Sequence, residues 1–386
     1  MKETLAAAGP TATLIQGHDG SREMILTLLC KRTYRLDPGG RLALAAEQVP
    51  LFEEPVIDHD RPGPLFLHDS DLYPWKPLTD VIVNGHAYAS APAPSFNAGV
   101  LVGTHAKHLA VIGNRRATLS STGKILFSAA EPVEKMPVSS DFAYGGLDAV
   151  AEATLGDPAA ALKACLPPEH RRRASLYLYP RNFAGKGYLI AATAEAVEAC
   201  ELPNLEDPAD RLTPDRLAVG NVDRWPLMPL PWSLGVLDFG CFPRVGYAGV
   251  VPNHEPGLGI FAEITRGFAS ASIINPVYVS PDDRMDTRFT SSGSLGLQLP
   301  ELRGNEPVVL HNLHRAHEKL SFALPGERPR LDLPASGGLE RADATLATVT
   351  IEPDEDRVTL VWRGTTRAKR AYLPDELARM AFLVEW

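Results

Sequence analysis

The chain has 386 residues, 45% of them hydrophobic and 22% charged, and a formal net charge of −9. Such values are typical of a folded globular protein and exclude intrinsic disorder, which needs low hydrophobicity and high charge. The 31 glycines and 34 prolines favour many short elements over a helix bundle or coiled coil. The acidic balance argues against direct nucleic-acid binding, which usually requires a basic domain or stripe.

Cysteine usage and apolar patterning limit the cellular context. None of the four cysteines belongs to a Cys-x-x-Cys pair, so a zinc or thioredoxin-like motif is not supported. The first apolar stretch is broken by Gly9 and Pro10, which makes a poor signal peptide. No window approaches 18 consecutive apolar residues. We therefore expect a cytoplasmic protein without membrane contact and without a cofactor.

The N-terminal part predicts a series of short strands. Residues 24–36 and 41–46 alternate around an Asp-Pro-Gly-Gly turn and predict a β-hairpin. The proline-rich residues 49–77 predict an irregular surface excursion. Further strands are expected where alternation resumes between turn residues, at the spacing of a sandwich or barrel. Their ranges are 79–89, 95–104, 107–112 and 124–128.

The middle and the C-terminal part differ in pattern. Asp157 as N-cap and Pro158 at the first position predict a short helix over 157–165, whereas 167–231 is rich in proline and predicts irregular chain over a β scaffold. Strands return at 306–310 and as a hairpin of 345–352 with 357–363, followed by a short helix over 375–380. The expected fold is mainly β, with antiparallel sandwich- or barrel-like sheets, a long irregular Pro-rich middle and few short helices. The expected regions are an N-terminal β region (1–140), the middle (141–245) and a C-terminal β region (246–386).

The densest cluster of chemically active side chains is His311–Glu318. Because residues 308–310 predict a strand, His311 and His314 would lie on opposite faces, and a helix would separate His311 from His317 by about 120°. This pattern favours a polar turn that closes a strand. A hydrolase or metal-dependent enzyme that uses this region stays an alternative hypothesis.

Nucleophile and phosphate-binding signatures are missing from the sequence. The serine-rich stretch at 291–296 lacks the Gly-x-Ser-x-Gly spacing, and there is no Walker A run. We therefore predict no enzyme and assign no catalytic, cofactor-binding or metal-binding residue.

Tryptophans beside prolines are the remaining local signal. Trp75, Trp225 and Trp232 lie in Pro-rich stretches. Each can fix a loop onto the core, or it can anchor a partner, because rigid aromatic side chains dominate interface energies. Both interpretations stay open, and the three are candidate partner-binding anchors.

Several short blocks in a fixed order resemble one bacterial family. Residues 181–188 (RNFAGKGY) resemble its R-N-P-x-G-[RK]-G-[FY] signature, with Phe183 where proline is usual. Residues 71–81, 142–146 and 202–208 resemble its S-D-x-x-P-x-K-P-x-T-D, [FY]-G-G and L-P-N-[IL]-E-x-P blocks. In 285–296 the chain departs from an aromatic and acidic family stretch. The signature residues are Asp80, Gly145, Gly146, Arg181, Asn182, Gly185, Gly187, Pro203, Asn204, Arg303, Gly304, Asn312 and His314.

The family that these blocks resemble was long catalogued as a domain of unknown function. Its members are viewed as adaptors or chaperones that load toxic effectors onto the type VI secretion spike. The resemblance, over residues 24–364 as one unit, implies a non-enzymatic adaptor whose partners are an effector toxin and a VgrG-type spike. A structural component of the secretion apparatus is the second alternative. The blocks are dominated by turn-forming residues, so we expect them to be mainly architectural.

Overall fold

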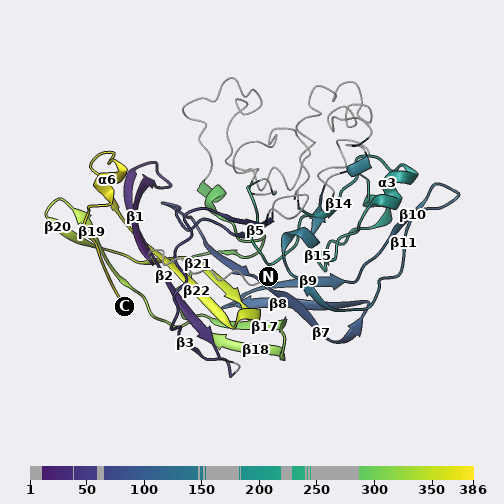
Figure 1. Cartoon of the computed structure of the whole chain (residues 1–386), viewed down its shortest axis with the longest axis horizontal. Coiled ribbons are helices and arrows are strands. Elements are labelled where there is room, and N and C mark those ends of the chain that lie inside the picture. The colour runs from purple at the N-terminus through teal and green to yellow at the C-terminus, as the bar shows by residue number, and fades with distance from the viewer. Residues whose placement is uncertain are drawn as a thin grey trace, which may run out of the picture.

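The computed structural model describes residues 11–37, 39–58, 65–146, 148–150, 153, 182, 184–218, 228–239, 241, 244 and 287–386. In these ranges the chain is mainly β, with several antiparallel sheets and no closed barrel (Figure 1). The expected fold class is confirmed. Two short α-helices lie wholly within these ranges, α3 (Ala194–Ala199) and α6 (Pro374–Leu377).

The largest sheet has seven strands. Its order is β1-β2-β22-β21-β6-β16, with β3 paired to β2, and all pairs are antiparallel except β21 with β6. The strands are β1 (Ala12–His18), β2 (Met24–Leu36), β3 (Leu42–Leu44), β6 (Thr79–Val83), β16 (Gln298–Leu299), β21 (Thr345–Glu352) and β22 (Arg357–Arg367).

A five-stranded sheet has the order β15-β9-β8-β17-β18, and a three-stranded sheet has the order β20-β19-β23. Their strands are β8 (Ser95–Val102), β9 (His105–Ile112), β15 (Leu205–Glu206), β17 (Pro307–His314), β18 (His317–Ala323), β19 (Arg330–Ala335), β20 (Gly338–Ala342) and β23 (Leu383–Glu385). The remaining strands pair two by two: β4 (Val56–Asp58) with β5 (Leu65–His68), β7 (His86–Ala93) with β12 (Val133–Pro137), β10 (Ala117–Leu119) with β11 (Ile125–Phe127), and β13 (Tyr144–Gly145) with β14 (Lys186–Gly187).

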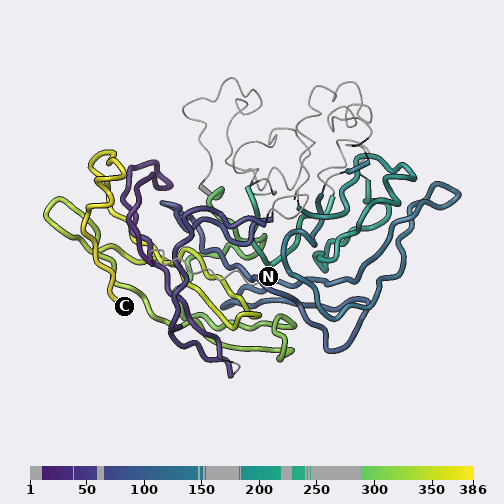
Figure 2. Tube along the Cα trace, viewed as in Figure 1, coloured from purple at the N-terminus to yellow at the C-terminus, as the bar shows by residue number. Residues whose placement is uncertain are grey.

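The N-terminal and C-terminal β regions share both large sheets. β2 pairs along its length with β22, and β8 pairs with β17. Figure 2 shows the same interleaving, with purple N-terminal chain beside yellow C-terminal chain. One hydrophobic core, built from both sheets, includes Leu28, Val100, Leu310 and Trp362.

Strands of this chain form where β-branched and apolar residues alternate or run together. The central strand β2 is buried on both faces over most of its length, as expected for a strand with neighbours on each side. The predicted hairpins of 24–36 with 41–46 and of 345–352 with 357–363 are confirmed.

The expected single strand over 79–89 is instead two strands, β6 and β7. Asn84 and Gly85 separate them, and Gly85 has φ +155°. The chain leaves the seven-stranded sheet at this point and enters the pair β7–β12. Alternation does not reveal such a change of sheet, because both halves keep a period of two. The predicted helix over 157–165 lies outside the described residues, and α6 covers the start of the helix expected at 375–380.

Candidate functional site

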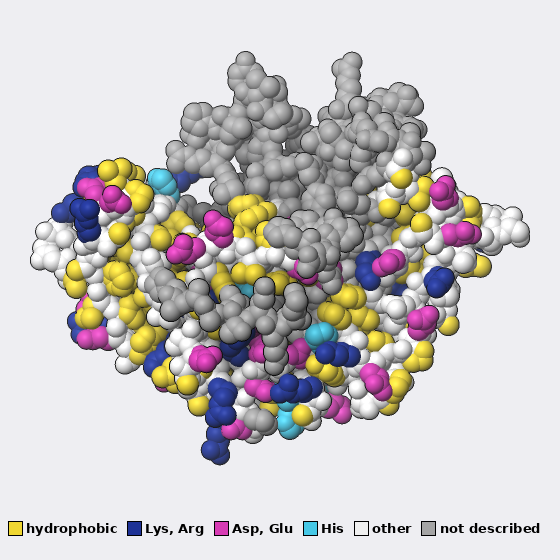
Figure 3. Space-filling model, in the orientation of Figure 1, with side chains coloured by type: hydrophobic (Ala, Val, Ile, Leu, Met, Phe, Trp, Pro, Cys, Tyr) yellow, Lys and Arg dark blue, Asp and Glu magenta, His cyan; other side chains and the backbone are white. Residues whose placement is uncertain are grey.

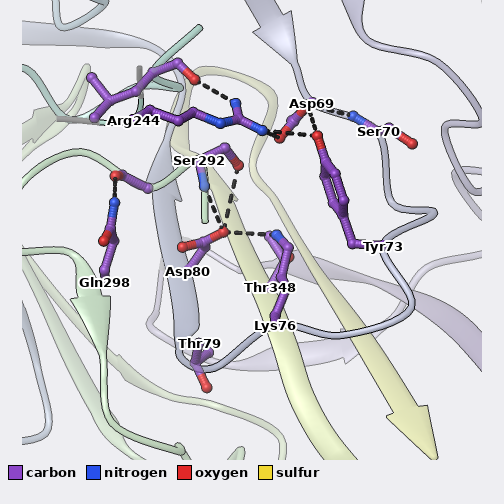
Figure 4. Close-up of polar contacts among 12 residues, drawn as sticks. Asp69, Ser70, Tyr73, Lys76, Thr79, Asp80, Arg244, Ser292, Gln298 and Thr348 are labelled. Carbon is purple, nitrogen blue, oxygen red and sulfur yellow. Dashed lines mark hydrogen bonds and ion pairs between the residues drawn. The ribbon is translucent and has the colours of Figure 1, made fainter. Parts of the chain in front are cut away.

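The block at 71–81 places a buried ion pair against the seven-stranded sheet. Lys76 Nζ lies 2.7 Å from Asp80 Oδ2 and donates to Thr348 Oγ1 at 3.1 Å. The Lys76 and Asp80 side chains are 4% and 0% exposed. Ser292 N–H donates to the same Asp80 oxygen at 2.9 Å (Figure 4). Because both side chains are almost fully buried, each charge is compensated mainly by the other. Removal of either would leave an unpaired buried charge.

A second buried cation, Arg244, joins separate stretches of chain (Figure 4). Its Nη2 lies 2.7 Å from Asp69 Oδ2 and 2.8 Å from Tyr73 Oη. Its other nitrogens donate to the carbonyls of Leu237 at 2.7 Å and Phe289 at 2.9 Å. Burial raises the pKa of Tyr73, so its hydroxyl stays protonated and can donate to Asp69. The guanidinium thus joins the segment at 69–73 to Leu237 and Phe289.

Lys31 completes this network on β2. Its Nζ lies 2.9 Å from Asp71 Oδ2 and 3.8 Å from the centroid of the Phe52 ring, on which the His68 ring stacks. Burial lowers the pKa of Lys31, an effect that Asp71 partly opposes, and burial also lowers the pKa of His68, partly opposed by Glu352. The cavity among these groups has a volume of about 10 Å³, which holds about one water molecule.

Two glycine-rich blocks meet in the parallel pair β13–β14. Gly146 N–H donates to the carbonyl of Asn182 at 2.7 Å, and Tyr188 N–H donates to that of Gly145 at 2.8 Å. The buried Asn182 amide donates to the carbonyl of Ser140 at 2.5 Å. Gly145 has φ +150°, and a Cβ there would collide with the Asn182 carbonyl. Only glycine therefore permits this approach.

The next residues continue the same close packing. A Cβ on Gly185 would lie 2.6 Å from the Ala143 carbonyl oxygen, and one on Gly187 would lie 2.8 Å from Pro203 Cδ. Asn204 Nδ2 donates to a carbonyl of β9 at 2.9 Å. The described residues of the blocks at 142–146, 181–188 and 202–208 thus pack closely against one another. We call this arrangement the glycine junction.

The signature residues Arg303, Gly304 and Asn312 lie at turns or irregularities of the chain. The Glu306 carboxylate accepts the N–H groups of Arg303 at 2.6 Å and Gly304 at 2.9 Å. Gly304 has φ +83°, and a Cβ there would lie 2.7 Å from the Trp362 ring. Asn312 has φ +54°, and its side chain donates to a carbonyl of β8 at 2.8 Å.

The His311–Glu318 segment spans the end of β17 and the start of β18, and the turn that closes β17, as the sequence predicts, is formed by Arg315 and Ala316. The His314 ring is 3% exposed, its Nε2 lies 3.2 Å from Asp356 Oδ1, and it stacks on His317. The His311 side chain is 47% exposed. Within the described ranges, no group of three or more His, Cys, Asp or Glu side chains is placed to hold a metal ion. The enzymatic alternative stays a hypothesis.

Two of the predicted anchors contact cations of this chain. The half-buried Trp75 ring has the Arg363 guanidinium 4.5 Å from its centroid, and the half-buried Trp232 ring has Lys107 Nζ at 4.1 Å. Trp232 Nε1 also donates to the His108 carbonyl at 2.7 Å. Both rings thus contact side chains of their own chain, and their role as partner anchors or as loop-fixing groups stays a prediction. The predicted residues outside the described ranges are Trp225, Arg181 and Phe183.

Sequence reasoning missed Arg244 and Lys107. Lys107 Nζ donates to Ser294 Oγ at 2.8 Å, and burial lowers its pKa well below the ordinary lysine value. Each is a single basic residue whose partners lie far away in the sequence. No local spacing could have identified them.

Over residues 21–363 the chain matches a family described as an uncharacterized protein conserved in bacteria (DUF2169). The chain belongs to this family. The matched range agrees with the 24–364 expected from the ordered blocks, and the family's range contains the Lys76–Asp80 pair and the glycine junction. Searches of curated proteins and of solved structures find no match.

The family's range contains every element of the seven-stranded sheet except β1 and the last residues of β22. Among the described helices, none is both long and apolar enough to cross a membrane.

Proposed function

We propose that this protein is a non-enzymatic adaptor that binds an effector toxin of type VI secretion and helps to load it onto a VgrG-type spike. The proposal rests on the resemblance of the ordered sequence blocks and on one structural observation. The described signature side chains with the most distinctive chemistry, Asp80, Asn182 and His314, are buried against groups of their own chain. Such residues shape the molecule, and an adaptor needs a defined shape.

The surface also fits a protein-binding role. On the face drawn in Figure 3, acidic and basic side chains are interspersed with apolar ones. The net charge of −9 would favour encounter with a basic partner, such as a toxin that acts on nucleic acid. We place this activity in the cytoplasm, where an effector would be bound before secretion.

Co-purification tests the proposal. The tagged chain is expressed with the effector and the VgrG protein encoded beside it, each alone and both together. We expect retention of the effector, and retention of VgrG that depends on the effector. A chain that retains neither protein would overturn the proposal.

The same experiment separates the alternatives. Stable incorporation into an assembled baseplate or sheath without any effector would favour a structural component. One equivalent of tightly bound metal, together with a hydrolytic activity that His314→Ala abolishes, would favour the enzyme.

A further inference from the structure

Lys31 and Asp71 form a buried pair between the middle of β2 and the segment that contains β4 and β5. Lys31 Nζ lies 2.9 Å from Asp71 Oδ2, and the two side chains are 3% and 8% exposed. The hydroxyls of Thr27 and Thr33, on the same face of β2, also hydrogen-bond to backbone groups that flank this segment. The pair thus lies where a long excursion of the chain packs against the seven-stranded sheet.

The Lys31 ammonium has one oxygen partner in the part of the chain that the structure describes. Nζ donates to Asp71 Oδ2, and its other close neighbour is the Phe52 ring, with the centroid 3.8 Å away. An ammonium carries three N–H donors, and a ring face is a weaker acceptor than an oxygen atom. Burial lowers the pKa of Lys31, and Asp71 opposes only part of this effect. The surroundings therefore favour the neutral amine more than water does, and the neutral amine is the nucleophilic form of lysine.

The two oxygens of the Asp71 carboxyl group lie in different surroundings. Oδ2 accepts hydrogen bonds from Lys31 Nζ and from the N–H of Phe52, the latter at 2.8 Å. Oδ1 accepts no hydrogen bond from any described residue. A backbone N–H that points at one carboxyl oxygen stabilises the negative charge that develops there when a nucleophile attacks the carbon. Oδ2 is therefore the oxygen that can be retained, and Oδ1 is the one that can leave.

The cavity of about 10 Å³ borders this pair and holds about one water molecule. Lys31, Asp71 and the His68 ring are among the residues that line it. Burial lowers the pKa of His68, so its ring is uncharged near neutral pH and has a nitrogen that can accept a proton. The cavity thus offers room for one departing water molecule, and a group that can carry a proton from the amine to the carboxyl group.

We propose that Lys31 and Asp71 become joined by an intramolecular amide bond, an isopeptide bond, once the chain has folded. Proton transfer from the ammonium to the carboxylate leaves a neutral Nζ, which attacks Cγ of Asp71. The Nζ–Cγ bond forms and the Cγ–Oδ1 bond breaks. Two protons of the original ammonium leave with Oδ1 as one water molecule, the third stays on the amide nitrogen, and Oδ2 becomes the amide oxygen. The step needs no oxidant, reductant or second substrate.

The neighbouring Lys76–Asp80 pair provides a comparison within the same chain. Lys76 Nζ has two oxygen partners, Asp80 Oδ2 at 2.7 Å and Thr348 Oγ1 at 3.1 Å. The second oxygen stabilises the ammonium, which is not a nucleophile. Lys76–Asp80 therefore remains an ion pair, and Lys31–Asp71 is the pair that reacts.

Burial does not prevent this reaction, since both reacting groups belong to the chain and no outside molecule has to enter. The fold holds the two groups in contact, which replaces a bimolecular encounter with an intramolecular one. The product joins β2 to the segment that contains β4 and β5, across 40 positions of sequence. Because a cross-link restricts the unfolded chain, the bond makes the scaffold harder to unfold. It does not depend on the proposed adaptor function.

Mass spectrometry of the full chain tests the proposal. The purified chain is reduced, so that no disulfide accounts for a change in mass, and its intact mass is measured in denaturing solvent. We expect a mass below that of the sequence by one water molecule. Digestion should then release a branched peptide in which Lys31 is joined to Asp71, and trypsin should not cleave after Lys31.

Two variants separate this bond from other losses of water. Lys31→Arg keeps the positive charge but lacks an amine that can form the bond, so its mass should equal that of its own sequence. Asp71→Asn can form the same amide with release of ammonia, so its product should have the same mass as the wild-type product. If Lys31→Arg does not fold, as judged by thermal unfolding, the branched peptide of the wild-type chain decides alone.

Three results would overturn the isopeptide bond. The first is a wild-type mass equal to that of the sequence, even after prolonged incubation of the folded chain. The second is a loss of water that persists in folded Lys31→Arg. The third is a branched peptide that links Lys76 to Asp80, or any other pair, in place of Lys31 and Asp71.

Discussion

The Lys76–Asp80 pair and the cleft of about 950 Å³ beside β20 and β22 use their polar groups in opposite ways. At Lys76–Asp80 the charges are almost fully buried and paired within the chain. At the cleft, which lies between the β2–β22 and β19–β20 faces, charged side chains such as Glu23 and Arg367 remain exposed. The first region carries the sequence signature, whereas the second carries none of the residues that the resemblance singled out.

This contrast indicates how the family signature should be interpreted. Buried charges and left-handed glycines tolerate few replacements, so they produce recognisable blocks. Exposed positions tolerate many replacements at little cost in stability. The binding surface of such a protein can therefore leave no motif.

The substitution with the largest expected effect on this comparison is Asp80→Ala. It would leave the Lys76 ammonium buried and unpaired, and we expect a loss of about 3–5 kcal/mol in the free energy of unfolding. Urea denaturation measures this loss. The double variant Lys76→Met with Asp80→Leu removes both charges and should recover most of it. A single variant that loses less than about 1 kcal/mol would show that the pair is not essential to the scaffold.

Gly145→Ala tests the glycine junction. The new methyl group would collide with the Asn182 carbonyl at a backbone with φ +150°, so we expect a loss of about 2–3 kcal/mol in unfolding free energy. Gly123→Ala is the matched control, because Gly123 has φ +75° and open space around it. Its cost should be about 1 kcal/mol. Equal costs at the two positions would show that the close approach contributes nothing.

Trp232→Ala tests whether the Trp232 ring binds the partner or only holds its own loop against the sheet. As an anchor, Trp232 should contribute about 2 kcal/mol to effector binding, measured by calorimetry on the co-purified pair. Trp75→Ala provides a comparison at the other half-buried tryptophan. Unchanged affinity for the effector, together with a lowered unfolding temperature, would show that the Trp232 ring only stabilises the fold through its contact with Lys107.

The smallest effect is a pH dependence at His68. Burial holds its pKa below 6.5 in the folded state, so between that lowered value and 6.5 the unfolded chain binds a proton that the folded chain does not. The free energy of unfolding should therefore fall as pH decreases below about 6.5, by less than about 1.4 kcal/mol per pH unit. His68→Gln should remove this part of the slope. Identical slopes in the two proteins would contradict the assignment.

The sequence predicts the local elements better than their assembly. The hairpins at 24–46 and 345–363 follow from alternation around recognisable turns, which depends on neighbouring residues only. The parallel pairing of β6 with β21 joins segments more than 260 residues apart, and no local pattern encodes it.

The candidate sites show the same limit. The turn at His311–Glu318 could be predicted because the preceding residues predict a strand. Arg244 could not, because its partners Asp69 and Phe289 come from distant segments. The cleft could not be predicted either, since it lies between strands of two different sheets and does not depend on any one residue type.

The most direct test measures effector binding by the wild-type chain and by the folded Lys76→Met/Asp80→Leu double variant. Our account expects the wild type to retain the effector and the double variant to bind it within about threefold of wild type, because the buried pair only supports the scaffold. A wild-type chain that retains no effector, or a folded double variant that has lost it, would contradict the account.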